Sequence, residues 1–404
     1  MFGLFEDSYV EYLTPLTYTR PVFELRSGIY TLRERIEATL KKAGLTNSLE
    51  LLLVRNELAE PYSRILRRYK INEIPYPDEE LILINGRLIL TDDILNIISI
   101  PKSNLVLTHG REILLIKLSR HIVKEMGEVL SRPLGDEVLN LLKRSVEVVE
   151  VSKPMLIRAL WDLLDMNKKL IELDLSLSDI TSFRQGNSKT YCAGEVSEKA
   201  VLNDKSGPIV IERGAVIEDF AYVEGPSYIA RGCRINDHSH VSNCSLGPKT
   251  TISGYVEQTI IQGYSDVMPY TFLRTSYIGE WVLIGPNVAI TDVKLTLGSI
   301  KFKVDDVVVD TGFMELGSFI GDLAKFASGT TIFPGKIIGV ASQVIGIVDR
   351  NIPSFTLWHG YSKSSRKLEL DKVLEIYKRY AYLKEEMPSY AYMDVLKKLY
   401  SETT

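Results

Sequence analysis

The sequence predicts an α/β domain followed by a parallel β-helix and a helical tail. Residues 1–180 alternate short apolar runs with helical patterns, which is typical of a parallel or mixed sheet with crossover helices. From residue 207 onward, aliphatic residues recur at an interval of six, and a repeat of that length indicates a solenoid. After about residue 366 the apolar residues return to helical spacing. A chain of 404 residues is long enough for two such domains.

The composition is that of an ordinary globular protein, with 45% hydrophobic and 25% charged residues. The net charge of −4 gives no reason to expect nucleic acid or an anionic membrane as a partner. No apolar run approaches the roughly 20 residues of a membrane span, and the N-terminus lacks the pattern of a secretory signal. We therefore expect a cytoplasmic protein. The 3 cysteines favour neither a disulfide framework nor a zinc site, and the scarcity of glutamine leans towards a thermophile.

The first domain should contain a mixed set of strands and helices. The stretch after Thr31 predicts a helix, because Thr31 and Glu34 stand at capping-box spacing and Gly44 ends the pattern. A second helical pattern covers residues 156–175 and leads out of the domain. The predicted strands are residues 4–7, 51–54, 81–84 and 104–108.

The predicted β-helix covers residues 207–352, after a polar linker at 181–206. Three hexads would form one triangular coil, with aliphatic side chains inside and a small residue at each corner. The stretch 295–316 breaks the register and predicts a loop or hairpin between coils. Residues 353–404 predict a helical tail that packs on the β-helix end or on a neighbouring subunit. The predicted inward positions are Ile211, Ile217, Val223, Ile229, Ile235, Val241, Ile278, Ile284, Ile290, Ile320, Phe326, Ile332, Ile338 and Val344.

Six sequence blocks occur in an order that is familiar from one enzyme family. They are LTPLTYTRPVFELRSGIYTLRERIE, INGRLIL, WDLLDMNKKLIE, IIQGYSD, SYIGEWVLIG and TGFMELGSFIGDLAK. Together they resemble the alternative form of the bifunctional UDP-N-acetylglucosamine diphosphorylase / glucosamine-1-phosphate N-acetyltransferase family. The resemblance covers almost the whole chain. It implies a Rossmann-like nucleotidyltransferase domain joined to a left-handed β-helix, assembled as a homotrimer.

Two arginines are the predicted catalytic residues of the first half. No glycine lies between Glu6 and Arg20, so the glycine-rich phosphate loop of most sugar-phosphate nucleotidyltransferases is missing. Arg20 and Arg26 precede a helix whose N-terminus favours an anion. Two guanidiniums there could stabilise the reacting phosphorus. The alternative is that both arginines pair with nearby glutamates at the surface.

The predicted substrate residues are Thr19, in the same block as the arginines, and Asn85, Gly86 and Arg87 of the INGR motif. INGR ends an apolar strand, where open α/β folds place ligands; the alternative is a simple Asn-Gly turn. The implied Mg²⁺ prefers hard oxygen ligands. Its candidate ligand is Asp162, with the pair Asp92 and Asp93 as further options, although each could equally be a helix cap or a solvated charge.

The β-helix half lacks the histidine that the acetyltransferases of this family use as general base. The alignment of FLRTSYIGEW with the family pattern puts Pro269 at that position, and proline cannot accept a proton. General base catalysis contributes about 10²–10⁴-fold, so acetyl transfer should fail unless another base substitutes. His238, His240 and His359 are the candidates, but none falls on an inward position of the repeat.

Three functions remain open at this stage. The leading hypothesis is a Mg²⁺-dependent sugar-1-phosphate nucleotidyltransferase that joins a sugar 1-phosphate to a nucleoside triphosphate. The sequence does not distinguish uridine from thymidine triphosphate or name the sugar. The alternatives are an acetyl-coenzyme A dependent sugar N-acetyltransferase with a relocated base, and a non-catalytic paralogue that binds sugar nucleotides.

Overall fold

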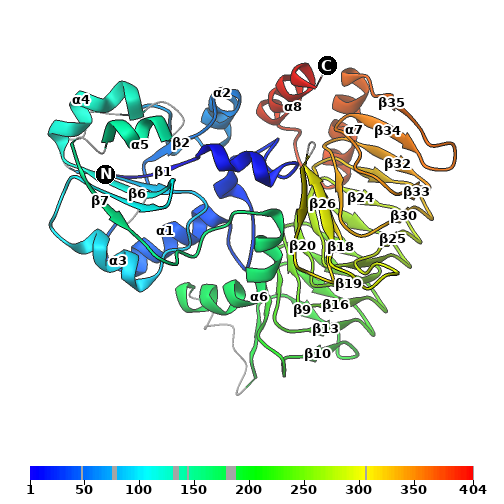
Figure 1. Ribbon diagram of the computed structural model, residues 1–404. Helices are drawn as coiled ribbons and strands as arrows, with labels where there is room; N and C mark the ends of the chain where they lie inside the picture. Colours follow the sequence, from blue (N-terminus) through cyan, green and yellow to red (C-terminus); the bar gives the residue numbers. More distant parts are fainter. Residues whose placement is uncertain are drawn as a thin grey trace.

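A mixed seven-stranded sheet forms the centre of the N-terminal domain (Figure 1). The computed structural model describes residues 1–46, 49–74, 80–130, 136–142, 145–178, 188–304 and 307–403. The strand order is β3-β2-β1-β4-β6-β5-β7, in which β1 runs parallel to β2 and β4 while β6 runs antiparallel to β4 and β5. The strands are β1 (Phe2–Phe5), β2 (Leu51–Leu53), β3 (Lys70–Ile71), β4 (Leu81–Asn85), β5 (Leu105–His109), β6 (Glu112–Leu118) and β7 (Glu147–Glu150).

Helices cover both faces of this sheet. Apolar residues of α4 and α5 pack on one face, and those of α1, α2, α3 and α6 pack on the other. The capping box predicted for α1 is confirmed, because the Thr31 and Glu34 side chains accept from each other's backbone N–H groups at 3.2 and 2.8 Å. The helices are α1 (Leu32–Lys42), α2 (Asn56–Ile65), α3 (Asp92–Ser99), α4 (Arg120–Leu130), α5 (Asp136–Leu142) and α6 (Leu160–Leu177), with 3-10 turns η1 (Ser8–Leu13) and η2 (Val22–Glu24).

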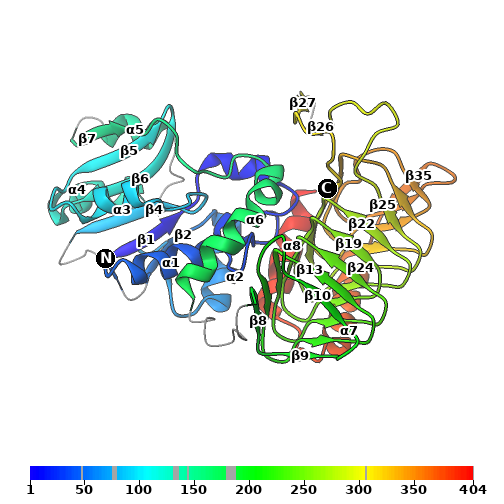
Figure 2. The same ribbon diagram turned by 90° about the horizontal axis from the view of Figure 1, so that it is seen from below.

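The C-terminal half is the predicted left-handed parallel β-helix, built from three long sheets (Figure 2). The first sheet contains β8 (Thr190–Cys192), β11 (Ile209–Ile211), β14 (Ser227–Ile229), β17 (Ser245–Leu246), β20 (Ile260–Gly263), β23 (Tyr277–Glu280), β28 (Ser318–Ile320) and β31 (Lys336–Ile338). The second contains β9 (Glu195–Val196), β12 (Val216–Ile217), β15 (Arg234–Ile235), β18 (Thr251–Ile252), β21 (Asp266–Val267), β24 (Leu283–Ile284), β29 (Lys325–Phe326), β32 (Gln343–Ile345), β34 (Thr356–His359) and β35 (Ser364–Lys367). The third contains β10 (Val201–Asn203), β13 (Tyr222–Glu224), β16 (His240–Ser242), β19 (Tyr255–Glu257), β22 (Phe272–Arg274), β25 (Ala289–Ile290), β30 (Thr331–Ile332) and β33 (Ile347–Val348).

The hexapeptide register is confirmed at every predicted inward position. All fourteen of these side chains are at most 3% exposed, and they form one continuous apolar core. The corners between sheets require a left-handed backbone at one residue per turn, which glycine adopts most easily. Non-glycine residues also take this conformation here, for example Asn243 (φ 54°), Gln258 (φ 47°) and Thr275 (φ 43°) on three successive coils.

The β-helix begins and ends outside its predicted limits. Its first coil is formed by β8, β9 and β10, so residues 190–203 belong to the β-helix although the sequence predicted a linker there. The reason is that the spacing from β8 to β9 and from β10 to the next coil does not follow the six-residue repeat. At the other end, β34 and β35 extend the second sheet to Lys367, inside the predicted tail. The predicted insertion forms an antiparallel hairpin of β26 (Lys301–Val304) and β27 (Val307–Asp310).

Two helices form the tail, α7 (Leu370–Leu383) and α8 (Tyr390–Glu402). They share an apolar cluster with Trp281, Leu323 and Phe355 of the later coils, so the tail packs along a corner of its own β-helix. Helix α8 also lies beside α2 of the N-terminal domain (Figure 1). Arg64 of α2 and Asp394 of α8 form an ion pair at 2.7 Å. The C-terminal tail therefore contacts both halves of the molecule.

The cysteines are free thiols, and burial raises the pKa of Cys233 and of Cys244 to about 12. Such thiols stay protonated at neutral pH and are poor nucleophiles. Among the described residues, no helix is both long enough and apolar enough to cross a membrane.

Candidate functional site

Four polar side chains meet where strands β1 and β4 end, at the sheet edge where open α/β domains place ligands. Asn85 ends β4; its Nδ2 donates to Asp7 at 2.8 Å, and its Oδ1 accepts from the backbone N–H of Arg87 at 2.9 Å. Arg87 is fully buried and donates to Asp7 at 3.0 and 2.5 Å and to Glu112 at 3.0 Å. A main-chain carbonyl accepts from its Nη1 at 2.7 Å. The guanidinium therefore holds two carboxylates in place.

A cavity of about 400 Å³ opens beside this cluster and is lined in part by Glu6, Asp7 and Arg55. Two backbone N–H groups donate to Glu6, including that of Arg55 at 3.1 Å. Burial raises the pKa of Glu6 above its ordinary value, and the Arg55 charge opposes this rise. Arg55 Nη2 also donates to the carbonyl groups of Thr17 at 2.6 Å and Arg20 at 3.1 Å. We call this space the edge cavity.

The aspartates considered as magnesium ligands are placed elsewhere. Asp162 caps α6, because its Oδ2 accepts from two backbone N–H groups at 2.7 and 2.9 Å. Asp92 and Asp93 are exposed in the first turn of α3. Across the described part of the chain, no group of three or more His, Cys, Asp and Glu side chains could hold a metal ion.

Gly86 packs against Phe23, and a Cβ at this position would lie 2.8 Å from the ring.

Thr19 and Arg20 lie at the junction with the β-helix instead of at the sheet edge. Asp322 accepts from the Thr19 hydroxyl at 2.6 Å, from Arg20 Nη2 and from the Tyr392 hydroxyl at 2.9 Å. Arg20 Nη1 lies 3.1 Å from a carboxylate oxygen of Glu280. Although burial opposes the charge of Arg20, Asp322 and Glu280 hold its pKa well above the ordinary range. Both partners of this arginine come from the β-helix.

Arg26 is docked on the β-helix through its backbone. Its N–H is shared by Gln262 Oε1 and the Tyr277 hydroxyl, each at 3.0 Å, and Gln262 Nε2 donates to the Glu24 carbonyl at 2.8 Å. Arg20 and Arg26 both line a cavity of about 380 Å³ between the N-terminal domain, the β-helix and the tail, which we call the junction cavity. The predicted site residues thus form two groups, one at the sheet edge and one at the junction.

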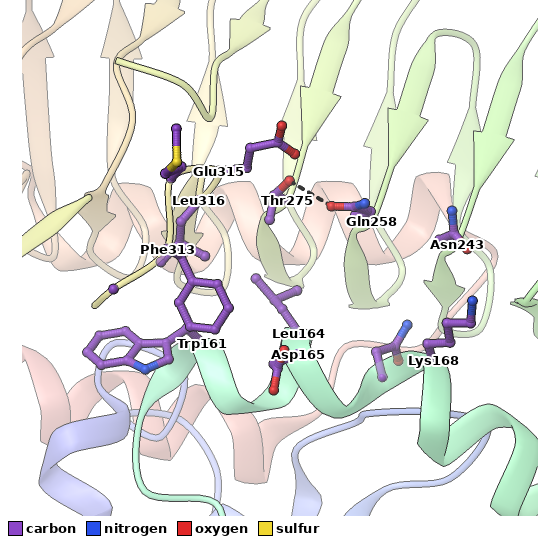
Figure 3. Close-up of a pocket in the computed structure, with 13 residues that line it drawn as sticks. Trp161, Leu164, Asp165, Lys168, Asn243, Gln258, Thr275, Phe313, Glu315 and Leu316 are labelled. Carbon is purple, nitrogen blue, oxygen red and sulfur yellow. Dashed lines mark hydrogen bonds between the residues drawn. The ribbon is translucent and has the colours of Figure 1, made fainter. Parts of the chain in front are cut away.

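A third cavity, of about 700 Å³, separates α6 from a corner of the β-helix (Figure 3). Trp161 and Leu164 of α6 face the inserted segment at its apolar end, while Lys168 faces Asn243 and Gln258 at its polar end (Figure 3). Trp161 stacks on Phe302 of the β26–β27 hairpin with 5.7 Å between the ring centres. The insertion therefore completes one wall of this cavity. The remaining lining residues are Asp165, Asn167, Thr275, Gly312, Phe313, Met314, Glu315 and Leu316.

The three histidines considered as a relocated base are not placed in any of these cavities. His238 stacks on Phe220 at 5.1 Å, and His240 stacks between two tyrosine rings at 4.9 and 4.4 Å. His359 is exposed, and its Nδ1 lies 2.9 Å from a serine hydroxyl. Pro269 lies at a corner of the β-helix, where its carbonyl accepts a backbone N–H from the next coil at 3.0 Å. None of these three histidines therefore lines one of the three described cavities.

Residues 2–181 match the family model described as sugar nucleotidyl transferase. The match covers 180 of the 404 residues, so the N-terminal part of the chain is similar to that family. The sugar nucleotidyl transferase domain is the part that contains the sheet and both groups of predicted residues. The resemblance inferred from the sequence blocks is confirmed in this respect.

The chain is also similar to several curated proteins. An Escherichia coli protein named uncharacterized acetyltransferase YaiX is 23% identical over 167 residues, which is 40% of this chain and 73% of that protein. The bifunctional protein GlmU of Geobacillus thermodenitrificans is 27% identical over 164 residues, which is 34% of this chain and 36% of that protein. The match thus spans about a third of the GlmU relative. The solved structure of a Francisella novicida UDP-N-acetylglucosamine acyltransferase covers 52% of this chain and 90% of its own, with 13% identity and a TM-score of 0.28.

Several residues of the edge cavity and of the adjoining Arg87 cluster were not predicted from the sequence, namely Glu6, Asp7 and Arg55 of the cavity and Glu112 of the cluster. A local signal was available for the first two, because Glu6 and Asp7 directly follow an apolar strand. Arg55 and Glu112 reach the site from β2 and β6. Their positions depend on the order of strands in the sheet, which no local pattern reveals.

Proposed function

We propose that the protein is a sugar-1-phosphate nucleotidyltransferase that works at the edge cavity. In this reaction a phosphate oxygen of the sugar 1-phosphate attacks the α-phosphorus of a nucleoside triphosphate. A new P–O bond forms, the bond to the β-phosphate oxygen breaks, and pyrophosphate leaves. The nucleophile is already anionic at neutral pH, since the second pKa of such a phosphate is about 6. The site therefore has to position and neutralise charge, and it needs no general base.

The observation that carries this proposal is the fixed charge cluster at the carboxyl ends of β1, β2 and β4, within the family's domain. Arg87 and Asn85 act as positioning residues, because they hold the Asp7 carboxylate at the cavity wall. Arg55 is the cation that lines the cavity. Catalysis of phosphoryl transfer consists largely of positioning and electrostatic stabilisation, and rigid buried groups supply both.

The acidic lining of the edge cavity suits a triphosphate whose charge is already neutralised by a cation. Five carboxylates line it, those of Glu6, Asp7, Glu11, Glu57 and Glu402, and Arg55 is the one cation among its described lining residues. Mg²⁺ usually keeps waters and substrate phosphates as ligands and needs only one or two carboxylates. Glu11 and Glu57, which are exposed, are the residues that would hold the ion. When bound, Mg²⁺ would neutralise phosphate charge.

The test is pyrophosphate release by the purified protein with Mg²⁺, uridine or thymidine triphosphate, and hexose or hexosamine 1-phosphates. We expect Asp7→Asn and Arg55→Met to lower turnover by at least about 10²-fold, the scale of losing one stabilising group in a preorganised site. Arg20→Ala in the same assay tests the catalytic role predicted for that residue. The control is Glu50→Gln, which changes a carboxylate outside the edge cavity. No release with any substrate pair would refute the proposal.

A homotrimer is a further part of the proposal. Exposed apolar side chains follow the third sheet of the β-helix and its adjoining turns: Val201 (52% exposed), Phe220 (53%), Tyr270 (85%), Phe272 (38%), Phe333 (45%) and Ile347 (45%). A row of this kind is typical of a protein interface. Sedimentation equilibrium at micromolar concentration tests this assembly, and a monomer would refute it.

A further inference from the structure

The guanidinium of Arg26 is buried without a matching anion. The residue is 7% exposed, and its Nε has no hydrogen-bond partner. Its Nη1 donates to the carbonyl of Ile29. Its guanidinium carbon lies 5.6 Å from the centre of the Tyr228 ring, a favourable but weaker contact for a cation. Among the described residues, no carboxylate oxygen lies within 4.0 Å of its nitrogens. Burying a charge in this way is unfavourable unless something pairs with it.

The other charged side chains of the junction cavity all have partners. Besides Arg20, which is bound by Asp322 and Glu280, the cavity is lined by three glutamates. Glu24 is paired with Arg33, Glu280 with Arg20, and Glu386 with Lys249 at 2.8 Å. The carboxylates of Glu34 and Glu212 attract Arg26 only from a distance. Within the described lining, Arg26 is thus the cation that has no carboxylate partner within 4.0 Å.

We propose that Arg26 and the junction cavity form a binding site for a small phosphate-bearing molecule, separate from the edge cavity. A planar guanidinium that has no carboxylate partner matches the oxygens of a phosphate. The cavity of about 380 Å³ has room for more than the phosphate alone. Its wall carries Tyr264 and Trp281, stacked at 4.4 Å, which offer a flat surface to the rest of such a molecule.

The site is held rigidly by all three parts of the protein. The backbone of Arg26 is fixed by Gln262 and Tyr277 of the β-helix, and Tyr377 and Tyr392 of the tail line the opposite wall. A bound phosphate would therefore contact a surface that exists only when these parts are docked. Occupancy should stabilise the docked arrangement, because a ligand stabilises the state that binds it.

The experiment measures thermal unfolding and calorimetric binding in phosphate-free buffer, with inorganic phosphate, pyrophosphate or glucose 1-phosphate added at constant ionic strength. We expect the wild type to gain several degrees in Tm at ligand concentrations about 100 times the Kd. Arg26→Met should show a smaller gain, because only the edge cavity would remain to bind these ligands, and Arg26→Lys should bind at least tenfold more weakly at the junction cavity, since lysine lacks the forked donors. Arg213→Met is the matched control, because it removes one exposed arginine that does not line the cavity, and it should respond as the wild type does.

The outcomes separate this proposal from its alternatives. An equal gain in Arg26→Met, or no gain with any of the three ligands, overturns it. A loss of Tm in Arg26→Met without ligand, combined with unchanged binding in Arg26→Lys, would assign Arg26 a purely structural role. Tighter binding of glucose 1-phosphate than of phosphate would show that the cavity wall contacts the sugar. The measurement needs no turnover, so it can succeed even where nucleotidyl transfer fails.

Discussion

Asp322 is the residue whose replacement should reveal how strongly the parts of the protein are coupled. Its carboxylate accepts from Thr19 at 2.6 Å, Tyr392 at 2.9 Å and the backbone N–H of Glu280 at 2.8 Å, and it pairs with Arg20. These donors come from the N-terminal domain, the tail and the β-helix. Asp322 itself is only 2% exposed, so these interactions are buried. Asp322→Ala would leave Arg20 buried with Glu280 alone, at 3.1 Å.

The expected loss follows from the removal of one partner from a buried ion pair, which costs about 3–5 kcal/mol. The hydroxyl and amide donors left without an acceptor would add to this, and the relaxation of the site would offset part of it. We therefore expect the free energy of unfolding to fall by about 4 kcal/mol. Asp322→Asn keeps the shape and loses the charge, so its loss should be smaller.

Differential scanning calorimetry and urea unfolding measure this effect. The wild type should unfold in one main transition, and Asp322→Ala should split it, with the N-terminal domain unfolding first. The control is Asp219→Ala, which removes an exposed carboxylate paired with Lys199 and should leave the profile unchanged. A loss below about 1 kcal/mol in Asp322→Ala, the scale of a surface ion pair, would refute the reasoning.

Three further predictions concern separate parts of the chain. Phe302→Ala should destabilise the protein by about 3–5 kcal/mol in urea unfolding, because a fully buried ring between Trp161 and Phe319 is lost; an unchanged midpoint would show that the hairpin is not anchored there. Thr31→Ala should cost about 1 kcal/mol in the same assay by removing the α1 cap, and no loss would contradict the capping geometry. Burial lowers the pKa of His240 below its ordinary value, so its contribution to stability is present above about pH 6.5 and is lost as the pH falls through the lower folded pKa. His240→Phe should flatten the dependence of Tm on pH below 6.5, and an unchanged slope would rule this out.

The β-helix could be predicted from the sequence because its core repeats a single contact many times. Ile211 and its thirteen counterparts fill equivalent buried positions. Each of them needs an aliphatic or aromatic side chain for the same reason, so the pattern can be recognised from its repetition. The first coil escaped prediction because Cys192 lies only four residues before Val196, and Leu202 lies nine residues before Ile211, so the six-residue repeat is broken on both sides. Cys192, Val196 and Leu202 are also only partly buried, which removes the strong requirement for aliphatic side chains.

The candidate site could be predicted only in part. The end of β4 marked Asn85 and Arg87 as residues at a ligand-bearing edge, which is where the structure has them. The partners of Arg20 could not be predicted, because Glu280 and Asp322 lie 260 and 302 residues further along the chain. An arginine that is paired with carboxylates of the protein is not free to bind substrate. Because those carboxylates are distant in the sequence, the local sequence around the arginine does not show which case applies.

The contact between α8 and α2 has a consequence for how the protein is made. Helix α8 ends at Glu402, and it packs beside a helix that begins at Asn56. A ribosome synthesises the N-terminal domain long before it reaches α8. Part of the surface of that domain therefore stays uncovered until α8 has been made. The Arg64–Asp394 pair and the Asp322 contacts can then form only after the whole β-helix has wound. Synthesis of α8 is thus required before the tail and the N-terminal domain can form their contacts.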